Sequence, residues 1–393
     1  MIKHVFTVCM LACLLACTGN AGEYSSDWKA FEQEVDAKYP FFELKKIGND
    51  WKKAKRKLKD KADQARNDEE FLKVVMEALG VLRDGHAGFQ KTRSPIPARE
   101  PEYALPLTLM PAINKQVVIA DASPEVLKNL PPGTLVRSID GVPARKFLDT
   151  KTEETWKQGG GFSSPQRAAV FVYRQPLASQ KISEHKLVVS DGKRDRTITL
   201  KNDWEAKGWN HTYHMPRLDR GEGFCSYTRL PSGVGYMHLR RIRGKETLQG
   251  VRVALSKFPD AKGWIIDLRG NGGGNYSSEL PAALVETKLP LAVIIDAGCM
   301  SAGETLARDL KNGAGAKLFG STTAGASSAK YTWSFPSGVA TLILSQRSRG
   351  GLNGKPIEFF GIAPDVPIEA DPAELARGEN SEIKAAENFV LKK

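Results

Sequence analysis

Cysteine is scarce in this sequence and is concentrated where it contributes little to a fold. Of the 5 cysteines among 393 residues, Cys9, Cys13 and Cys17 lie at the very beginning. The body of the chain keeps only Cys225 and Cys299, which excludes a fold built on a framework of disulfides. These two remain able to pair in an oxidising compartment. We expect Cys299 to be a buried thiol.

Long apolar runs are also missing, except at the start. No internal stretch reaches the roughly 18 apolar residues that a membrane-spanning helix needs. The first residues read as an export signal, with Lys3 as the positive charge and residues 5–16 as a short apolar segment. The run 14–17, Leu-Leu-Ala-Cys, resembles a bacterial lipobox, which would make Cys17 the acylated first residue of a lipoprotein. The alternative is ordinary cleavage near Ala21. Both predict an exported protein of the periplasm or cell envelope, and the lipobox adds a lipid anchor.

Acidic residues are outnumbered, so the formal net charge is +12. A basic segment can attract nucleic acid or an anionic membrane. Beneath these charges, however, Trp51, Leu58 and Ala62 recur at helical spacing, and no nucleic-acid motif is present. We therefore predict a solvated helix face and no nucleic-acid partner. The cations in question are Lys45, Lys46, Lys52, Lys53, Lys55, Arg56, Lys57, Lys59, Lys61 and Arg66.

The spacing of apolar residues, and with it the predicted type of secondary structure, changes twice along the chain. Residues 27–83 have helical spacing, with Asn67 or Asp68 as a cap and Gly85 as a stop for the last helix. Short β-type runs punctuated by Pro and Gly follow to about residue 205. Beyond it strands and helices alternate, and the apolar runs 264–268 and 291–295 suit a parallel sheet buried on both faces. The second half is therefore predicted to be an α/β domain.

A chain of this length suggests two or three domains. We expect a leader and short linker, a helical domain, a β domain, an α/β core and a short tail with helical character. The predicted bounds are 1–22, 23–95, 96–205, 206–375 and 376–393.

Residues 267–274 run from a buried strand into four glycines. Glycine lets backbone N–H groups approach an anion closely, which suits an oxyanion hole. The run lacks the Gly-Lys-Ser/Thr ending of a phosphate-binding loop. A simple tight turn is the alternative.

Ser301 precedes a predicted helix over 302–311. A serine there is commonly a cap, and Glu304 has the spacing of a capping box. A nucleophile at the same place would gain from the helix dipole and from an adjacent backbone donor. Cys299 stands where the elbow of an α/β-hydrolase would need glycine, which disfavours that fold.

Histidine is rare, with 6 in the chain. His86 follows a predicted helix on a loop, where it is either a surface residue or a general base. His211 and His214 are spaced like metal ligands but lack further ligands at recognisable spacing. We therefore predict no metal and no other cofactor.

Five segments occur in the order found in the tail-specific, or C-terminal processing, proteases, which this chain resembles over nearly all of its mature length. They are 84–86, the PDZ-like run 131–141, 267–274, 301–304 and 361–365. Within the PDZ-like run, Thr134 replaces the usual Asp. The resemblance implies an α/β fold with a ClpP/crotonase-like catalytic core, an N-terminal helical segment and a PDZ-like β domain. It also implies a serine peptidase whose substrates are peptides or the C-terminal regions of proteins.

The family has two branches, which differ in the general base. In one branch a lysine activates the serine, but its position here is Ala326, and Lys330 comes four residues late. The tricorn-like branch uses an early histidine and a glutamate just before the Gly-Ile-x-Pro-Asp motif. His86 and Glu358 match those positions, so the resemblance favours Ser-His-Glu.

The resemblance then implies a role for each residue. Ser301 is the nucleophile, His86 its base, and Glu358 orients the imidazolium, directly or through a bridging group. The backbone N–H groups of Gly273 and Ala302 would form the oxyanion hole.

Other functions are compatible with the same features. The scaffold also occurs in a non-catalytic ligand-binding protein, so a silent peptide or hydrophobic-ligand binder is the main alternative. An esterase with the same three residues is another. The PDZ-like run implies binding of an extended peptide by strand addition. The sequence gives no indication of oligomeric state.

Overall fold

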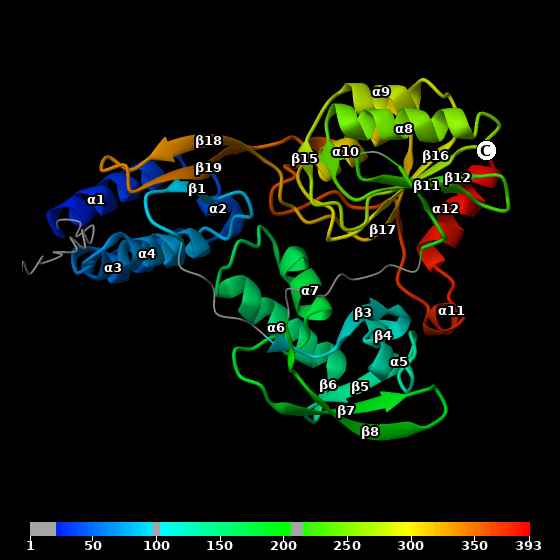
Figure 1. Ribbon diagram of the computed structural model, residues 1–393, viewed down its shortest axis with the longest axis horizontal. Helices are drawn as coiled ribbons and strands as arrows, with labels where there is room; N and C mark the ends of the chain where they lie inside the picture. Colours follow the sequence, from blue (N-terminus) through cyan, green and yellow to red (C-terminus); the bar gives the residue numbers. More distant parts are fainter. Residues whose placement is uncertain (1–20, 97–102, 206–214, 222) are drawn as a thin grey trace, which may run out of the picture.

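The computed structural model describes residues 21–96, 103–205, 215–221 and 223–393 (Figure 1). The predicted lipidation site Cys17 and the His211/His214 pair lie outside these ranges. Within them, no helix combines the length and the apolar character that crossing a membrane requires. Figure 1 shows three lobes that meet near the centre of the molecule.

The N-terminal lobe is built on four helices packed around an aromatic core. The cap prediction is confirmed, because the Asn67 side chain accepts a hydrogen bond from the N–H of Glu70 at 3.0 Å. The solvated face is also confirmed, because Trp51, Leu58 and Ala62 are the buried residues of α3. The helices are α1 (Ala21–Lys38), α2 (Phe42–Lys45), α3 (Gly48–Asp63) and α4 (Asp68–Val81).

Two predictions about this lobe are wrong. The residue that turns left-handed after α4 is Arg83, with φ 48°, and not Gly85. Glycine is needed at 85 for close packing instead, since a Cβ there would lie 3.1 Å from the carbonyl oxygen of Gly161. Lys45 is not on the solvated face: it is 1% exposed, because its ammonium group turns inward to buried acceptors.

A β-hairpin from the second half of the chain completes the N-terminal lobe. Strands β1 (Gly88–Thr92), β19 (Ala340–Ser348) and β18 (Ser328–Ser334) form an antiparallel sheet in that order. The ring of Phe335, at the hairpin turn, lies 5.8 Å from that of Phe31 in α1. Figure 1 shows the orange hairpin reaching from the core to the blue helices.

Among the described residues, the second lobe, called here the β domain, holds eight strands and three α-helices. Its antiparallel sheet has the order β3-β4-β5-β7-β8, with β6 on β5. Its PDZ-like character stays a prediction. The loop between α6 and α7 leaves this lobe toward the other two (Figure 1). The elements are β2 (Tyr103–Ala104), β3 (Leu107–Ala112), β4 (Gln116–Ala122), α5 (Pro124–Leu127), β5 (Leu135–Ile139), β6 (Val142–Pro143), α6 (Ala144–Lys157), α7 (Pro165–Arg174), β7 (Glu184–Ser190), β8 (Asp195–Lys201) and β9 (Trp204–Glu205).

The third lobe is a seven-stranded sheet of order β10-β11-β12-β14-β16-β17-β20, parallel from β12 onward. This confirms the α/β fold class. The strands are β10 (Asp219–Arg220), β11 (Cys225–Arg229), β12 (Gly235–Leu239), β14 (Trp264–Asp267), β16 (Leu291–Ile295), β17 (Lys317–Gly320) and β20 (Val366–Pro367), with a side ladder of β13 (Ile242–Arg243) and β15 (Gly274–Asn275).

Helices cover both faces of this sheet, as its continuous apolar strands require. Apolar residues of α8, α9 and α10 pack on one face, and those of α12 on the other. Cys225 and Cys299 are free, and the expectation of a buried thiol at Cys299 is confirmed. The helices are α8 (Lys245–Lys257), α9 (Glu279–Val285), α10 (Ala302–Ala314), α11 (Pro372–Ala376) and α12 (Ser381–Leu391).

Candidate active site

Ser301 lies at the carboxyl end of the sheet, between β16 and α10. Its backbone has φ 54° and ψ −118°, a region that residues other than glycine rarely adopt. The Ser301 N–H holds this conformation by donating to the carbonyl of Ala326 at 2.9 Å and to Glu304 Oε2 at 3.0 Å. Gly273 packs directly against it, because a Cβ at 273 would come within 2.7 Å of the Ser301 Cβ.

Glu304 is a fully buried carboxylate that organises the backbone around Ser301. Besides the Ser301 N–H, it accepts hydrogen bonds from the Thr323 hydroxyl at 2.6 Å and from the N–H groups of Gly325 and Ala326. Burial raises the pKa of Glu304 to about 7, and these hydrogen bonds oppose the rise. The carboxyl group therefore ties the first turn of α10 to the loop after β17.

His86 reaches Ser301 from the N-terminal lobe, 215 residues earlier in the sequence. Its Nε2 lies 3.2 Å from Ser301 Oγ. Burial, together with nearby cations, lowers the pKa of His86 to about 4, and the charge of Asp84 opposes this shift. The His86 N–H donates to Asp84 Oδ1 at 2.8 Å. At neutral pH the ring is uncharged and can take a proton from the hydroxyl.

Glu358 lies deep in the site but faces a lysine rather than the imidazole. Its Oε1 is 2.8 Å from Lys45 Nζ, with both side chains fully buried, and its Oε2 accepts the Ser327 N–H at 3.0 Å. Burial raises the pKa of Glu358 to about 7, while Lys45 opposes the rise. In the described part of the chain, no hydrogen bond joins Glu358 to His86, and His86 Nδ1 is buried without a partner.

The two predicted oxyanion donors lie side by side but are not equally available. The Gly273 N–H donates to Asn271 Oδ1 at 2.8 Å, so it is occupied in this structure. Ala302 is the first residue of α10, where backbone N–H groups have no partner within the helix. Its nitrogen lies 3.2 Å from the position of a Cβ at Gly273.

Comparison with known protein families identifies this region. Residues 233–285 and 275–368 match the model of Peptidase family S41. The chain carries a family S41 peptidase domain. The match includes Ser301, Gly273, Ala302 and Glu358, while His86 lies outside it. It confirms the predicted family and the predicted enzyme class, a serine peptidase.

Solved structures resemble the whole chain and not the S41 domain alone. The structure described as mature CPAF complexed with lactacystin has a TM-score of 0.63 and 14% identity, over 95% of this chain and 99% of that one. A putative peptidase from Parabacteroides merdae has a TM-score of 0.50 and 14% identity, over 94% of this chain and 97% of that one. At such identity the likeness shows the fold. A search of the curated proteins finds no match to the sequence.

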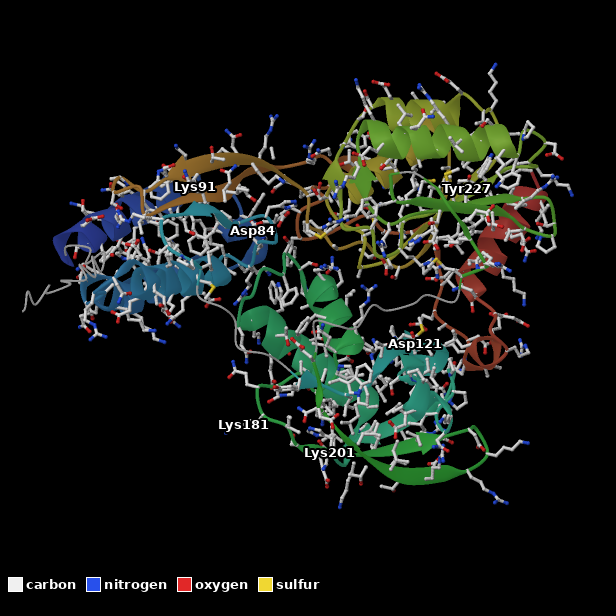
Figure 2. The ribbon with its side chains drawn as sticks, viewed as in Figure 1. Asp84, Lys91, Asp121, Lys181, Lys201 and Tyr227 are labelled. Carbon is white, nitrogen blue, oxygen red and sulfur yellow. The ribbon has the colours of Figure 1, made fainter. Side chains whose placement is uncertain are left out.

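A serine from the β domain connects Glu358 to the loop that carries His86. The Ser163 side chain is fully buried, its hydroxyl accepts the Gly85 N–H at 3.0 Å, and the same hydroxyl lowers the pKa of Glu358. Its neighbour Ser164 donates to the carbonyl of Ala324 at 2.5 Å. The α6–α7 loop is thus inserted between the N-terminal lobe and the S41 domain. In Figure 2 the labelled Asp84 lies near this junction.

Lys45, Asp84 and Ser163 surround the site but were not predicted. Lys45 belongs to a run of cations, and the only signal was its place between apolar Leu44 and Ile47. Asp84 was seen as part of a motif but given no role. Ser163 is in an ordinary loop, and its contacts arise only from tertiary structure. In the described ranges, no group of three or more His, Cys, Asp or Glu side chains is placed to hold a metal ion.

Proposed function

We propose that the S41 domain hydrolyses peptide bonds through an acyl-enzyme on Ser301, with His86 as the general base. The observation that carries the proposal is the 3.2 Å approach of Ser301 Oγ to His86 Nε2, an imidazole whose lowered pKa keeps it neutral. His86 takes the hydroxyl proton as Oγ attacks the scissile carbonyl, then gives it to the leaving amine. Water, deprotonated by the same ring, then hydrolyses the ester.

The Ala302 N–H is the first oxyanion donor in this proposal. Its position at the start of α10 adds the positive end of the helix dipole. The Gly273 N–H becomes the second donor when substrate binding releases it from Asn271.

Glu358 is assigned a positioning role, because its contacts are with Lys45, Ser327 and Ser163. Through Lys45 it holds the carbonyl of Arg83, to which Lys45 Nζ donates at 2.7 Å. Ser163 fixes the backbone of the same loop by accepting the Gly85 N–H. This role differs from the sequence-based prediction, in which Glu358 orients the imidazolium itself, directly or through a bridging group.

The proposed substrates are peptides or the C-terminal regions of proteins, cleaved internally. Strand β3 supports this, because it lies at an edge of its sheet and offers backbone groups to an extended chain. A cavity of about 400 Å³ lies between β3, α7 and residues of the third lobe. A peptide added to β3 beside α7 would occupy it.

We propose further that the protein is exported and anchored by a lipid on Cys17. The support is the lipobox-like sequence alone. Mass spectrometry of the mature protein from a bacterial envelope is expected to show a diacylated N-terminal Cys17, and Cys17→Ala is expected to abolish the lipid. An unmodified mature chain beginning near Gly22 would contradict the anchor.

Ser301→Ala tests the nucleophile. Hydrolysis of an unfolded protein such as casein is expected to fall at least about 1000-fold, and labelling by a fluorophosphonate probe to disappear. Ser256→Ala, at an exposed serine of α8, is the matched control and is expected to leave both unchanged. Retained hydrolysis or labelling in Ser301→Ala would refute the assignment.

A further inference from the structure

A cavity of about 680 Å³ lies where α2, α3 and the ends of α4 and α6 meet. Its charged lining is strongly unbalanced. A single acid, Asp50, stands among the residues that line it, against five cations: Lys45, Lys46, Lys53, Arg83 and Lys157. No role has been given to this cavity by the proposed peptidase mechanism.

Three of the five cations are already paired, Lys45 with the buried Glu358. Arg83 forms an ion pair with Asp50 at 2.8 Å, and Lys157 forms one with Glu153 on the exposed face of α6. Lys46 and Lys53 make no ion pair with any acidic side chain in the described part of the molecule. The cavity therefore keeps a positive potential that an anion would neutralise.

The inner wall also holds hydrogen-bond donors that lack an acceptor. Arg83 stacks over the ring of Trp156, 4.5 Å from its centroid, and only 9% of the arginine side chain is exposed. Arg83 Nε and Trp156 Nε1 are both buried without a hydrogen-bond partner in the described residues. Buried donors without acceptors are uncommon, and each calls for an explanation. Both atoms lie just behind the cavity surface, so a small shift of the stacked pair would turn them toward an oxyanion in the cavity.

The rest of the lining is apolar. Leu44 and Val81 line the cavity, and the Phe359 ring lies 5.9 Å from that of Trp156. We infer that this cavity binds an oxyanion, a carboxylate or a phosphate group, carried on an apolar body. The oxyanion lies among Lys46, Lys53 and Arg83, and the apolar body lies against Trp156 and Phe359.

The site is distinct from the Ser301–His86 pair but shares its framework. Lys45, whose ammonium binds Glu358 and the carbonyl of Arg83, contributes to the cavity wall, and Phe359 directly follows Glu358. Binding there is measured without turnover. It therefore stands or falls independently of the peptidase mechanism.

The test is calorimetric titration of the full chain with N-acetylphenylalanine, with its neutral amide and with inorganic phosphate. The carboxylate is expected to bind at least about tenfold more tightly than the amide, because the amide cannot make charge-assisted hydrogen bonds. Trp156→Phe removes the indole N–H but keeps an aromatic ring, and is expected to weaken the binding of N-acetylphenylalanine severalfold.

The double variant Lys46→Gln/Lys53→Gln is expected to weaken carboxylate binding about tenfold. Lys52→Gln/Lys57→Gln is its matched control, since it removes the same charge from exposed positions of α3 that do not line the cavity. N-acetylphenylalanine is expected to bind more tightly than inorganic phosphate, because only the former carries an apolar body. Tighter binding of inorganic phosphate would overturn the apolar part of the inference. Equal binding of acid and amide, or a double variant that binds like its control, would overturn the inference.

Discussion

The titratable side chains around Ser301 have pKa values displaced in opposite directions by the same cause. Burial lowers the pKa of His86 to about 4 and raises those of Glu304 and Glu358 to about 7. Removal from water disfavours the charged form of each group, and this acts oppositely on acids and bases. The histidine consequently loses its proton at a lower pH than the two carboxyl groups do.

The pH dependence of catalysis follows from the lowered pKa of His86. A base must be unprotonated, so kcat/KM with a fluorogenic peptide is expected to stay high from pH 7 down to about pH 5 and to be half-lost near pH 4. Lys330→Gln removes one cation that lowers this pKa and is expected to move the acid limb to higher pH. An acid limb at pH 6.5, the ordinary value for histidine, would contradict the assignment.

The contribution of Glu304 to the free energy of unfolding is expected to fall as pH rises. For an ordinary ion-paired carboxylate this contribution increases with pH. The pKa of Glu304 is higher in the folded chain than in the unfolded one, so the folded state binds the extra proton between about pH 4.5 and 7. This contribution to the free energy of unfolding is present below that window and is lost as pH rises through it.

Urea unfolding of wild type and Glu304→Gln at pH 5 and pH 8 measures this contribution. The variant is expected to be less stable at both, because an amide cannot accept from all four donors. The stability difference should be larger at pH 5, by up to about 3 kcal/mol. The same difference at both pH values would show that Glu304 ionises at an ordinary pKa.

Single residues also mark the limit of what the sequence predicts. Ser301 and His86 were found because each belongs to a motif with a recognisable neighbour. Lys45 was placed on a solvated face because it begins a run of cations in the sequence, and only the fold turns it toward Glu358. Its role depends on a partner near the other end of the chain, which helical spacing cannot reveal.

At the scale of elements, the α6–α7 loop joins the β domain to the site. The Ser163 hydroxyl accepts a hydrogen bond from the loop before His86, and the Ser164 hydroxyl donates one to the carbonyl of Ala324. The Gln166 amide donates to the carbonyl of Phe359 at 3.0 Å. The position of α7 and the geometry of the His86 loop are therefore coupled.

Ser163→Ala tests this coupling. It removes the acceptor of the Gly85 N–H in a part-buried hydrogen bond, so the expected loss of stability is about 1 kcal/mol. The kcat of peptide hydrolysis is expected to fall about tenfold with little change in KM, and the acid limb of the pH profile to shift. Ser164→Ala removes a contact from the same loop and is expected to lower stability without moving that limb. A pH profile unchanged in Ser163→Ala would reduce Ser163 to a structural role.

Elements were predicted best where one periodicity governs a whole segment. Strand β16 covers the predicted residues 291–295, and α10 begins at Ala302 as expected. The hairpin of β18 and β19 was not assigned to the N-terminal lobe, because alternating apolar residues specify a buried face but not the surface that buries it. Phe335 and Leu342 pack on helices at the far end of the sequence.

At the scale of the whole molecule, the site draws on all three lobes. His86 and Lys45 come from the N-terminal lobe, Ser163 from the β domain, and Ser301 and Glu358 from the S41 domain. The hairpin ties the first lobe to the last, so loss of its packing should displace His86 from Ser301.

Phe335→Ala tests that connection. Truncating a fully packed phenylalanine is expected to cost about 3–5 kcal/mol of stability. Because His86 depends on the same lobe, the temperature of half-inactivation should fall together with the unfolding temperature. Ile182→Ala, at an isoleucine that is 55% exposed, is the control and should change neither. A Phe335→Ala enzyme that unfolds at a lower temperature but keeps its temperature of half-inactivation would show that the hairpin does not support the site.

The scattering of these groups along the chain has a consequence for biosynthesis. His86 is made 215 residues before Ser301, and Glu358 comes later still. A nascent polypeptide on the ribosome therefore carries the base long before the nucleophile, and the carboxylate that steadies the base is added last. The timing of translation itself delays proteolytic competence until synthesis has passed residue 358.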